Sequence, residues 1–204
     1  VTGKSWQEWI DLDSWVRKYL IEEIFANLDA CFLSQFFYWN GGETDSRIYA
    51  GPVWDYDYAF GSDRAWQVAL PNTLCVNRYA VKDGFHTPWF HALHQKEPFY
   101  ARMVEIYQTE CVPLVEEFLY GYIDFCAEQI ADACSMDQIR WNLEKKDHSQ
   151  QARYLQDFLK LRIDFLNRIW IDQQPYCIVK ADSTRGDNYG YYGVFHGETL
   201  SALP

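Results

Sequence analysis

Apolar residues near the N-terminus recur at the spacing of a helix. Asp11 and Ser14 bring side chains that start helices, and apolar positions then follow three and four residues apart. We therefore expect a helix over residues 13–26. Apolar residues continue over residues 30–39, and this run predicts a segment that begins as a helix and ends as a buried strand.

A strong turn signal follows that strand. Asn40, Gly41 and Gly42 favour a tight reversal of the chain. Residues 47–57 then read as a returning strand, so the pattern predicts a β-hairpin. The stretch over residues 63–85 is irregular and polar.

Helical patterns dominate the second half of the chain. They cover residues 87–94, 98–109, 112–133, 136–141 and 149–170, and Pro175 closes the block. Residues 175–204 read instead as two short strands and a turn. The sequence therefore predicts a mostly helical α+β fold. We expect its main domain over residues 1–172 and a short β-rich tail over residues 173–204.

Two aspartates lie close together in the second predicted strand. Residues two apart in a strand point to the same face, so Asp55 and Asp57 would project together. Two like charges in an apolar setting are costly unless a cation, a shared proton or several donors offset them. The pair indicates either a divalent cation site or a turn in which each aspartate caps backbone amides.

A third aspartate precedes the hairpin. Asn27 follows the first predicted helix and is suited to end it in a left-handed conformation. Asp29 can cap a next helix that starts at Ala30, or it can face Asp55 and Asp57 across a short loop. Both interpretations stay open at this point.

Composition and charge narrow the classes of function. The chain has 204 residues, 49% of them hydrophobic and 18% aromatic, which fits one domain of ordinary size with a small appendage. The net charge of −11 and the lack of a basic cluster argue against general nucleic-acid binding. No apolar run approaches the length of about 20 residues that spans a bilayer, and no signal peptide is visible. Because the chain does not begin with Met, we expect a processed or excised piece, and any targeting sequence would lie upstream.

Cysteine and histidine spacings give only weak metal signals. The six cysteines form no C-x-x-C pair, and they are compatible with three disulfides or with six buried thiols. Of the three histidines His86, His91 and His94, the last two would share one face of a helix. A metal triad of these histidines is disfavoured because no carboxylate lies within the segment at ligand spacing.

The motifs together resemble the spore-coat protein H (CotH) kinase family over residues 5–172. The residues that carry the resemblance are Ile10 to Ser14, Glu23, Asn27-Leu28-Asp29, Tyr38, Ala50 to Gly61, Arg140-Trp141, Leu161-Arg162, Phe165-Leu166 and Trp170. The family implies an atypical protein-kinase-like fold. It also implies transfer of the ATP γ-phosphoryl group to Ser or Thr of protein substrates, with Mg²⁺ or Mn²⁺.

The resemblance also implies roles for individual residues. Asp29 would position the acceptor hydroxyl, and Asp55 would bind the metal. Asp57 would be an additional metal ligand or would hold Asp55 in place. Kinases carry a metal-binding Asn five residues after the catalytic Asp, and here that position is Ser34, followed by Gln35. Both offer an oxygen, so we expect Asn27, Ser34 and Gln35 to contribute to the cofactor site, with weaker metal affinity than Asn would give.

Further expectations concern the whole protein. The resemblance starts midway through the family domain, and the chain shows no glycine-rich phosphate loop and no lysine on a preceding strand. We therefore expect the C-terminal lobe of a kinase, inactive by itself. Residues 176–204 resemble the opening of extracellular repeats of the Listeria-Bacteroides type, which implies a secreted or surface protein of a bacterium.

Two other classes of function compete with the kinase. The first is a non-catalytic, kinase-like interaction module that binds glycan or cell-wall partners. An exposed Trp/Tyr platform far from Asp29, without metal affinity at Asp55, would favour it. The second is a glycosidase, which is disfavoured because Asp55 and Asp57 would sit side by side, whereas hydrolase carboxylates flank the scissile bond.

Overall fold

The computed structural model describes most of the main domain. It covers residues 3–27, 29, 33–42, 45–61, 71, 72, 74, 76, 89–143 and 147–174, with the backbone alone of residues 177–181 and 191–195. A 3₁₀ turn, η1 (Trp6–Glu8), leads into helix α1 (Leu12–Ile24). Asp11 caps α1, since its carboxylate accepts a hydrogen bond from the Ser14 amide at 3.0 Å. The helix predicted over residues 13–26 is present.

The predicted hairpin is present but shorter than expected. Strands β1 (Phe37–Trp39) and β2 (Ile48–Ala50) pair antiparallel, with Phe37 opposite Ala50. The expectation of a buried first strand is wrong, because the Trp39 side chain is 59% exposed. The second strand was expected to reach residue 57 but ends at Ala50. Pro52 has no amide to donate to a ladder, and Asp55 has a φ of 61°, which no extended strand contains.

The second half of the chain is helical, as predicted, but its divisions differ. The elements are α2 (Trp89–His94), α3 (Glu97–Ile106), η4 (Tyr107–Cys111), α4 (Val112–Glu117), η5 (Phe118–Tyr122), α5 (Ile123–Arg140) and α6 (His148–Trp170). Helical structure runs without a break from residue 97 to residue 140, where three separate helices were expected. The π turn η4 lies directly before Pro113, which cannot donate an amide, and it keeps the helical path intact. The helix predicted over residues 149–170 is confirmed as α6.

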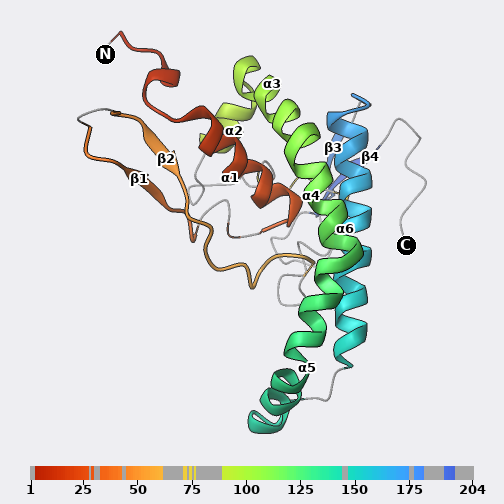
Figure 1. Cartoon of the computed structure of the whole chain (residues 1–204). Coiled ribbons are helices and arrows are strands. Elements are labelled where there is room, and N and C mark those ends of the chain that lie inside the picture. The colour runs from red at the N-terminus through yellow and green to blue at the C-terminus, as the bar shows by residue number, and fades with distance from the viewer. Residues whose placement is uncertain are drawn as a thin grey trace.

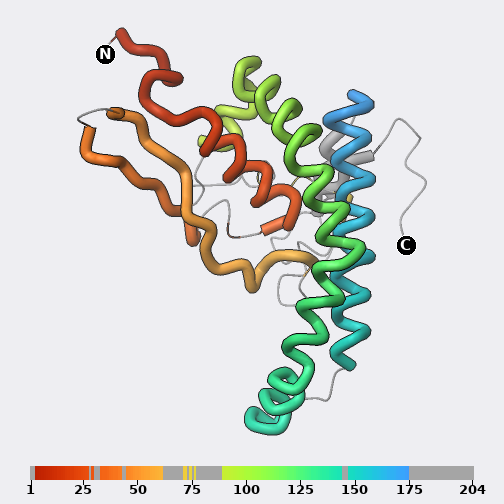
Figure 2. Tube along the Cα trace, viewed as in Figure 1, coloured from red at the N-terminus to blue at the C-terminus, as the bar shows by residue number. Residues whose placement is uncertain are grey.

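Helices α1, α3 and α6 enclose the core (Figure 1). The Tyr19 ring meets the Phe99 ring edge-on at 5.8 Å, and Tyr107 meets Trp170 at 4.9 Å. These side chains are almost wholly buried. Helices α5 and α6 pack side by side and extend beyond this core, away from the β-hairpin (Figure 2). The core therefore fixes α1, whose C-terminal end leads into the predicted site.

The C-terminal tail contains one pair of described strands. Strands β3 (Cys177–Ala181) and β4 (Tyr191–Phe195) pair antiparallel, as predicted for this segment.

Cys111, Cys126 and Cys134 are free thiols, so the alternative of three disulfides is not supported. The other three cysteines lie outside the described side chains. Over the described residues, no helix has the length and apolar character to cross a membrane. The overall fold is mostly helical with small antiparallel sheets.

Candidate metal centre

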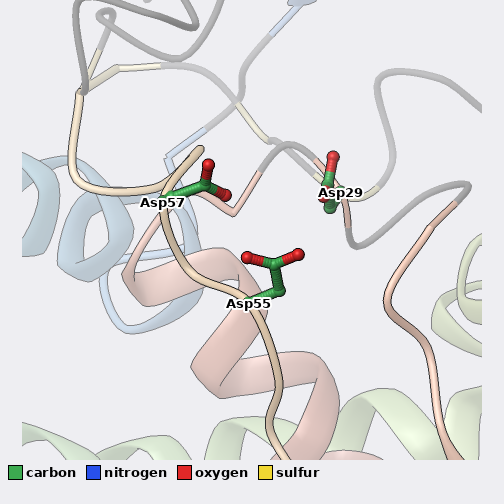
Figure 3. Close-up of side chains that lie close together, drawn as sticks. All are labelled: Asp29, Asp55 and Asp57. Carbon is green, nitrogen blue, oxygen red and sulfur yellow. The ribbon is translucent and has the colours of Figure 1, made fainter.

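Three carboxylates from two separate segments come together. Asp29, Asp55 and Asp57 each offer an oxygen, and these oxygens all lie within 4.8 Å of one another (Figure 3). Asp29 is buried, and the other two are exposed. Carboxylate oxygens at this separation can share one divalent cation, because Mg²⁺ and Ca²⁺ bind oxygens at about 2.0–2.6 Å. The arrangement is therefore a candidate metal centre.

Asp29 is held by the residues before and after it. The Asp29 amide donates to Oδ1 of Asn27 at 3.2 Å, and Nδ2 of Asn27 donates to Oε2 of Glu22 at 2.7 Å. Ser34 hydrogen-bonds to the Asp29 side chain, and the Leu33 amide donates to the Asp29 carbonyl at 2.9 Å. The carboxylate is thus fixed at the end of α1.

This arrangement corrects the expectation for Asn27. Ala26, with a φ of 50°, takes the left-handed conformation that ends the helix. Asn27 is instead wholly buried and forms a bridge between Glu22 and Asp29. The structure confirms one of the two interpretations of Asp29, since Asp29 faces Asp55 and Asp57. The other, a cap for a helix that starts at Ala30, lies outside the described residues.

Asp55 and Asp57 reach the site from a turn. The sequence predicted an extended strand that places both side chains on one face. This prediction is wrong, because Asp55 has a φ of 61°. The alternative of a capped turn is not found either, since within the described residues neither carboxylate accepts a backbone amide. The Tyr56 hydroxyl, between the two acids in sequence, is buried. The turn therefore places both acids near Asp29 and the intervening ring in the interior.

The segment after the pair is clamped to α6. The Tyr154 hydroxyl donates to the Gly61 carbonyl at 2.7 Å. Gly61 has a φ of 70°, and a Cβ there would lie 2.6 Å from the Phe158 ring, so only glycine fits. The Phe60 amide also donates to the Phe25 carbonyl at 2.7 Å. These contacts bring the turn that carries the two aspartates against the end of α1.

The three carboxylates of the cluster carry like charges and repel one another. Burial, followed by the negative charges of Asp55 and Asp57, raises the pKa of Asp29. The hydrogen bond from Ser34 offsets part of this effect. A cation between the carboxylates would offset this repulsion.

Ser34 and Gln35 lie beside the cluster. Ser34 has a φ of 53° and hydrogen-bonds to Asp29. Nε2 of Gln35 approaches Oε1 of Glu22 at 3.5 Å, and Oε1 of Gln35 is buried with no hydrogen-bond partner among the described residues. Ser34 therefore contacts Asp29 directly, whereas Gln35 contacts Glu22. Their assignment to a cofactor site stays a prediction.

The histidines do not add a second metal site in the described part of the chain. The His94 ring packs against the Tyr19 and Tyr100 rings, with centroids 5.4 and 5.2 Å away. His91 pairs with Gln95 at 2.7 Å, and His86 lies outside the described residues. Among the described residues, the three aspartates form the one group with metal-ligand geometry.

Sequence reasoning missed four residues that surround the centre. Lys18 and Glu22 form a buried ion pair at 2.5 Å, and their i, i+4 spacing was the available signal. Phe36 and Trp54 form an exposed aromatic pair, with ring centroids 5.8 Å apart in an edge-to-face arrangement. Trp54 directly precedes Asp55, and Phe36 directly follows Gln35.

Comparison with known proteins identifies the family of the chain. Residues 3–166 match the family described as CotH kinase protein. The match covers most of the chain, which makes this a kinase-like protein. The chain belongs to the CotH kinase family, as the motifs around Asp29 and Asp55 indicated. Curated proteins and solved structures gave no significant match.

Proposed function

We propose that this protein is part of an atypical protein kinase that transfers the γ-phosphoryl group of ATP to Ser or Thr of proteins, with Mg²⁺ or Mn²⁺. The observation that carries the proposal is the convergence of Asp29, Asp55 and Asp57 within 4.8 Å in a member of the CotH kinase family. Phosphoryl transfer needs positioning and electrostatic stabilisation more than covalent chemistry. Three carboxylates, one of them buried, are suited to that task.

The buried carboxylate is the candidate catalytic residue. Asp29 accepts a hydrogen bond from the acceptor hydroxyl and directs its oxygen at the γ-phosphorus. An oxygen–phosphorus bond forms, the bond to the bridging oxygen breaks, ADP leaves, and the hydroxyl proton passes to Asp29. Burial raises the pKa of Asp29, which makes it a better proton acceptor than an exposed aspartate.

Asp55 and Asp57 are the candidate cation ligands. Both are exposed and face Asp29, so their charges are accessible to an ion that arrives from solvent. A bound Mg²⁺ or Mn²⁺ would neutralise charge on the phosphates. Ser34 hydrogen-bonds to Asp29, and Gln35 has a buried oxygen without a partner among the described residues, so both are candidates to complete the cofactor site.

The aromatic pair supports binding of the nucleotide base. Trp54 is 59% exposed and Phe36 is 43% exposed, although both lie within two residues of site residues. Exposed rings bind flat bases by stacking. A nucleotide whose phosphates lie at Asp55 would bring its base within reach of these rings.

A non-catalytic interaction module is the second candidate function. Exposed aromatic side chains lie on the helical hairpin of η5, α5 and α6, which extends away from the β-hairpin (Figure 1). They include Tyr120, 77% exposed, and Trp141, 63% exposed. Such rings suit a glycan or cell-wall partner. We infer an extracellular or bacterial-surface location, because residues 176–204 resemble the opening of extracellular repeats.

A transfer assay separates the two functions. Because a C-terminal lobe is expected to be inactive by itself, the assay uses the full-length protein. Its incubation with γ-labelled ATP, Mn²⁺ and a generic acceptor such as casein should label Ser or Thr of the acceptor, and Asp29→Asn should abolish labelling. Asp132→Asn, an exposed carboxylate change on α5, is the matched control and should label normally. Labelling that survives Asp29→Asn would overturn the assignment of the catalytic residue. No labelling by the unchanged protein, together with no cation binding, would favour the interaction module.

A further inference from the structure

A buried ion pair contacts the segments that carry the metal centre. The Lys18 ammonium contacts Oε1 of Glu22 at 2.5 Å, and the two side chains are 2% and 0% exposed. Taking such a pair out of water costs about as much as the attraction returns. Helix α1 already buries Val16, Tyr19 and Leu20. The stability of the helix alone therefore does not account for this pair.

Glu22 contacts the segment that carries Asp29. Its Oε2 accepts from Nδ2 of Asn27 at 2.7 Å, and the other side of the Asn27 amide accepts from the Asp29 backbone at 3.2 Å. Nε2 of Gln35 approaches Oε1 of Glu22 at 3.5 Å. One carboxylate thus supports the chain on both sides of Asp29.

The same pair contacts the segment that carries the other two acids. Nζ of Lys18 donates to the Pro52 carbonyl at 3.4 Å and lies 6.0 Å from the centre of the Tyr56 ring. The Tyr56 hydroxyl is buried, and the neighbouring charge of Glu22 adds to burial in raising the pKa of Tyr56. Tyr56 stands between Asp55 and Asp57 in sequence. Lys18 and Glu22 are therefore in reach of both halves of the cluster.

We propose that Lys18 and Glu22 form a positioning pair that sets the distance between Asp29 and the Asp55–Asp57 turn, and so sets the cation affinity of the centre. This inference rests on the proposed function, in which the cluster binds a divalent cation. Neither residue touches the ion. Residues that hold metal ligands in place typically change metal affinity by about 10–100-fold when they are replaced.

The test compares two adjacent buried glutamates. Glu22→Gln keeps the shape of the side chain, but one face of its amide then presents a donor to Asn27 or to Lys18, and a contact is lost. Glu23→Gln is the matched control. Glu23 is equally buried and ion-paired, but it contacts Arg162 at 2.8 Å and the Val76 amide at 2.8 Å, and it does not belong to the group of three acids. Mn²⁺ affinity by calorimetry and amide hydrogen exchange at Asp29 are measured for each protein, with the midpoint of thermal unfolding.

The expected result is selective. Glu22→Gln should weaken Mn²⁺ binding roughly tenfold and speed exchange of the Asp29 amide. Glu23→Gln should lower the unfolding midpoint at least as much, yet leave Mn²⁺ affinity and Asp29 exchange unchanged relative to the unchanged protein. Equal Mn²⁺ affinity in Glu22→Gln and the unchanged protein would overturn the inference and leave the proposed function standing.

Two further results are distinguishable. If the unchanged protein binds no Mn²⁺, the proposed function fails and this inference fails with it. If Glu22→Gln does not fold, the double variant Lys18→Met with Glu22→Gln removes both charges and avoids an unpaired buried ammonium. Tight Mn²⁺ binding by that folded double variant would overturn the inference, and weakened binding would support it.

Discussion

Arg162 of α6 and Glu23 of α1 are joined by three hydrogen bonds in the interior. Nε and Nη2 of Arg162 donate to the Glu23 carbonyl at 2.8 and 2.6 Å, and Nη2 also donates to the carboxylate at 2.8 Å. Both side chains are 0% exposed. The last long helix is thereby fixed to the end of the helix that leads into Asp29.

Removal of this arginine should therefore destabilise the whole domain. Arg162→Met leaves the Glu23 carboxylate buried without its cationic partner, and we expect the free energy of unfolding to fall by about 3–5 kcal/mol. Urea denaturation followed by circular dichroism measures the loss. Arg168→Met on the same helix, where the exposed arginine donates to the Asp164 carbonyl, should cost less than about 1 kcal/mol. Equal losses for the two variants would contradict the role of Arg162.

Stability should also depend on pH through His94. Burial, with a smaller contribution from the charge of His91, lowers the pKa of His94 to about 4. The folded state thus favours the neutral ring. The resulting stabilisation is complete above the unfolded-state pKa of about 6.5 and is lost as the pH falls from about 6.5 to about 4.

The shift corresponds to a loss of about 3 kcal/mol over that range. His94→Phe keeps a ring between Tyr19 and Tyr100 and removes the titration, so its stability should vary less between pH 7 and pH 4. Urea unfolding at a series of pH values checks this. The same pH dependence in His94→Phe as in the unchanged protein would show that other groups cause it.

Nucleotide affinity should depend on Trp54. If the base stacks on the exposed pair formed with Phe36, Trp54→Ala should weaken ATP binding roughly tenfold in the presence of Mn²⁺. Trp39→Ala is the matched control, because Trp39 on β1 is also 59% exposed. Calorimetry with ATP measures both. A loss of affinity in Trp39→Ala that equals the loss in Trp54→Ala would indicate non-specific effects and refute base stacking at this pair.

Much of the fold could be predicted from local pattern. The cap of Asp11, the periodicity of α1 and α6 and the turn at residues 40–42 are short-range signals, and the corresponding elements are present. The unbroken helix over residues 97–140 was missed. Its π turns shift the register of apolar residues, and a period of 3.6 read along the sequence then breaks into pieces.

The candidate site was predicted for a partly wrong reason. The grouping of Asp29 with Asp55 and Asp57 agrees with the structure, but the strand geometry used to align the pair does not. The positive φ of Asp55 is uncommon for a residue other than glycine, although aspartate adopts it more often than most residues do, so local propensity does not specify it at this position. The burial of Lys18 and Glu22 also escaped prediction, since it depends on contacts with residues 27–56 that no local pattern specifies.

Calorimetric titration of Mn²⁺ into the unchanged protein, Asp55→Asn and Asp132→Asn at neutral pH, with and without ATP, decides whether the acidic cluster is a cation site. We expect the unchanged protein and Asp132→Asn to bind Mn²⁺ alike, and Asp55→Asn to bind at least about tenfold more weakly, because a candidate cation ligand of the acidic cluster is lost. Equal binding by Asp55→Asn, or no binding by the unchanged protein under either condition, would contradict the assignment of Asp29, Asp55 and Asp57 as a metal centre.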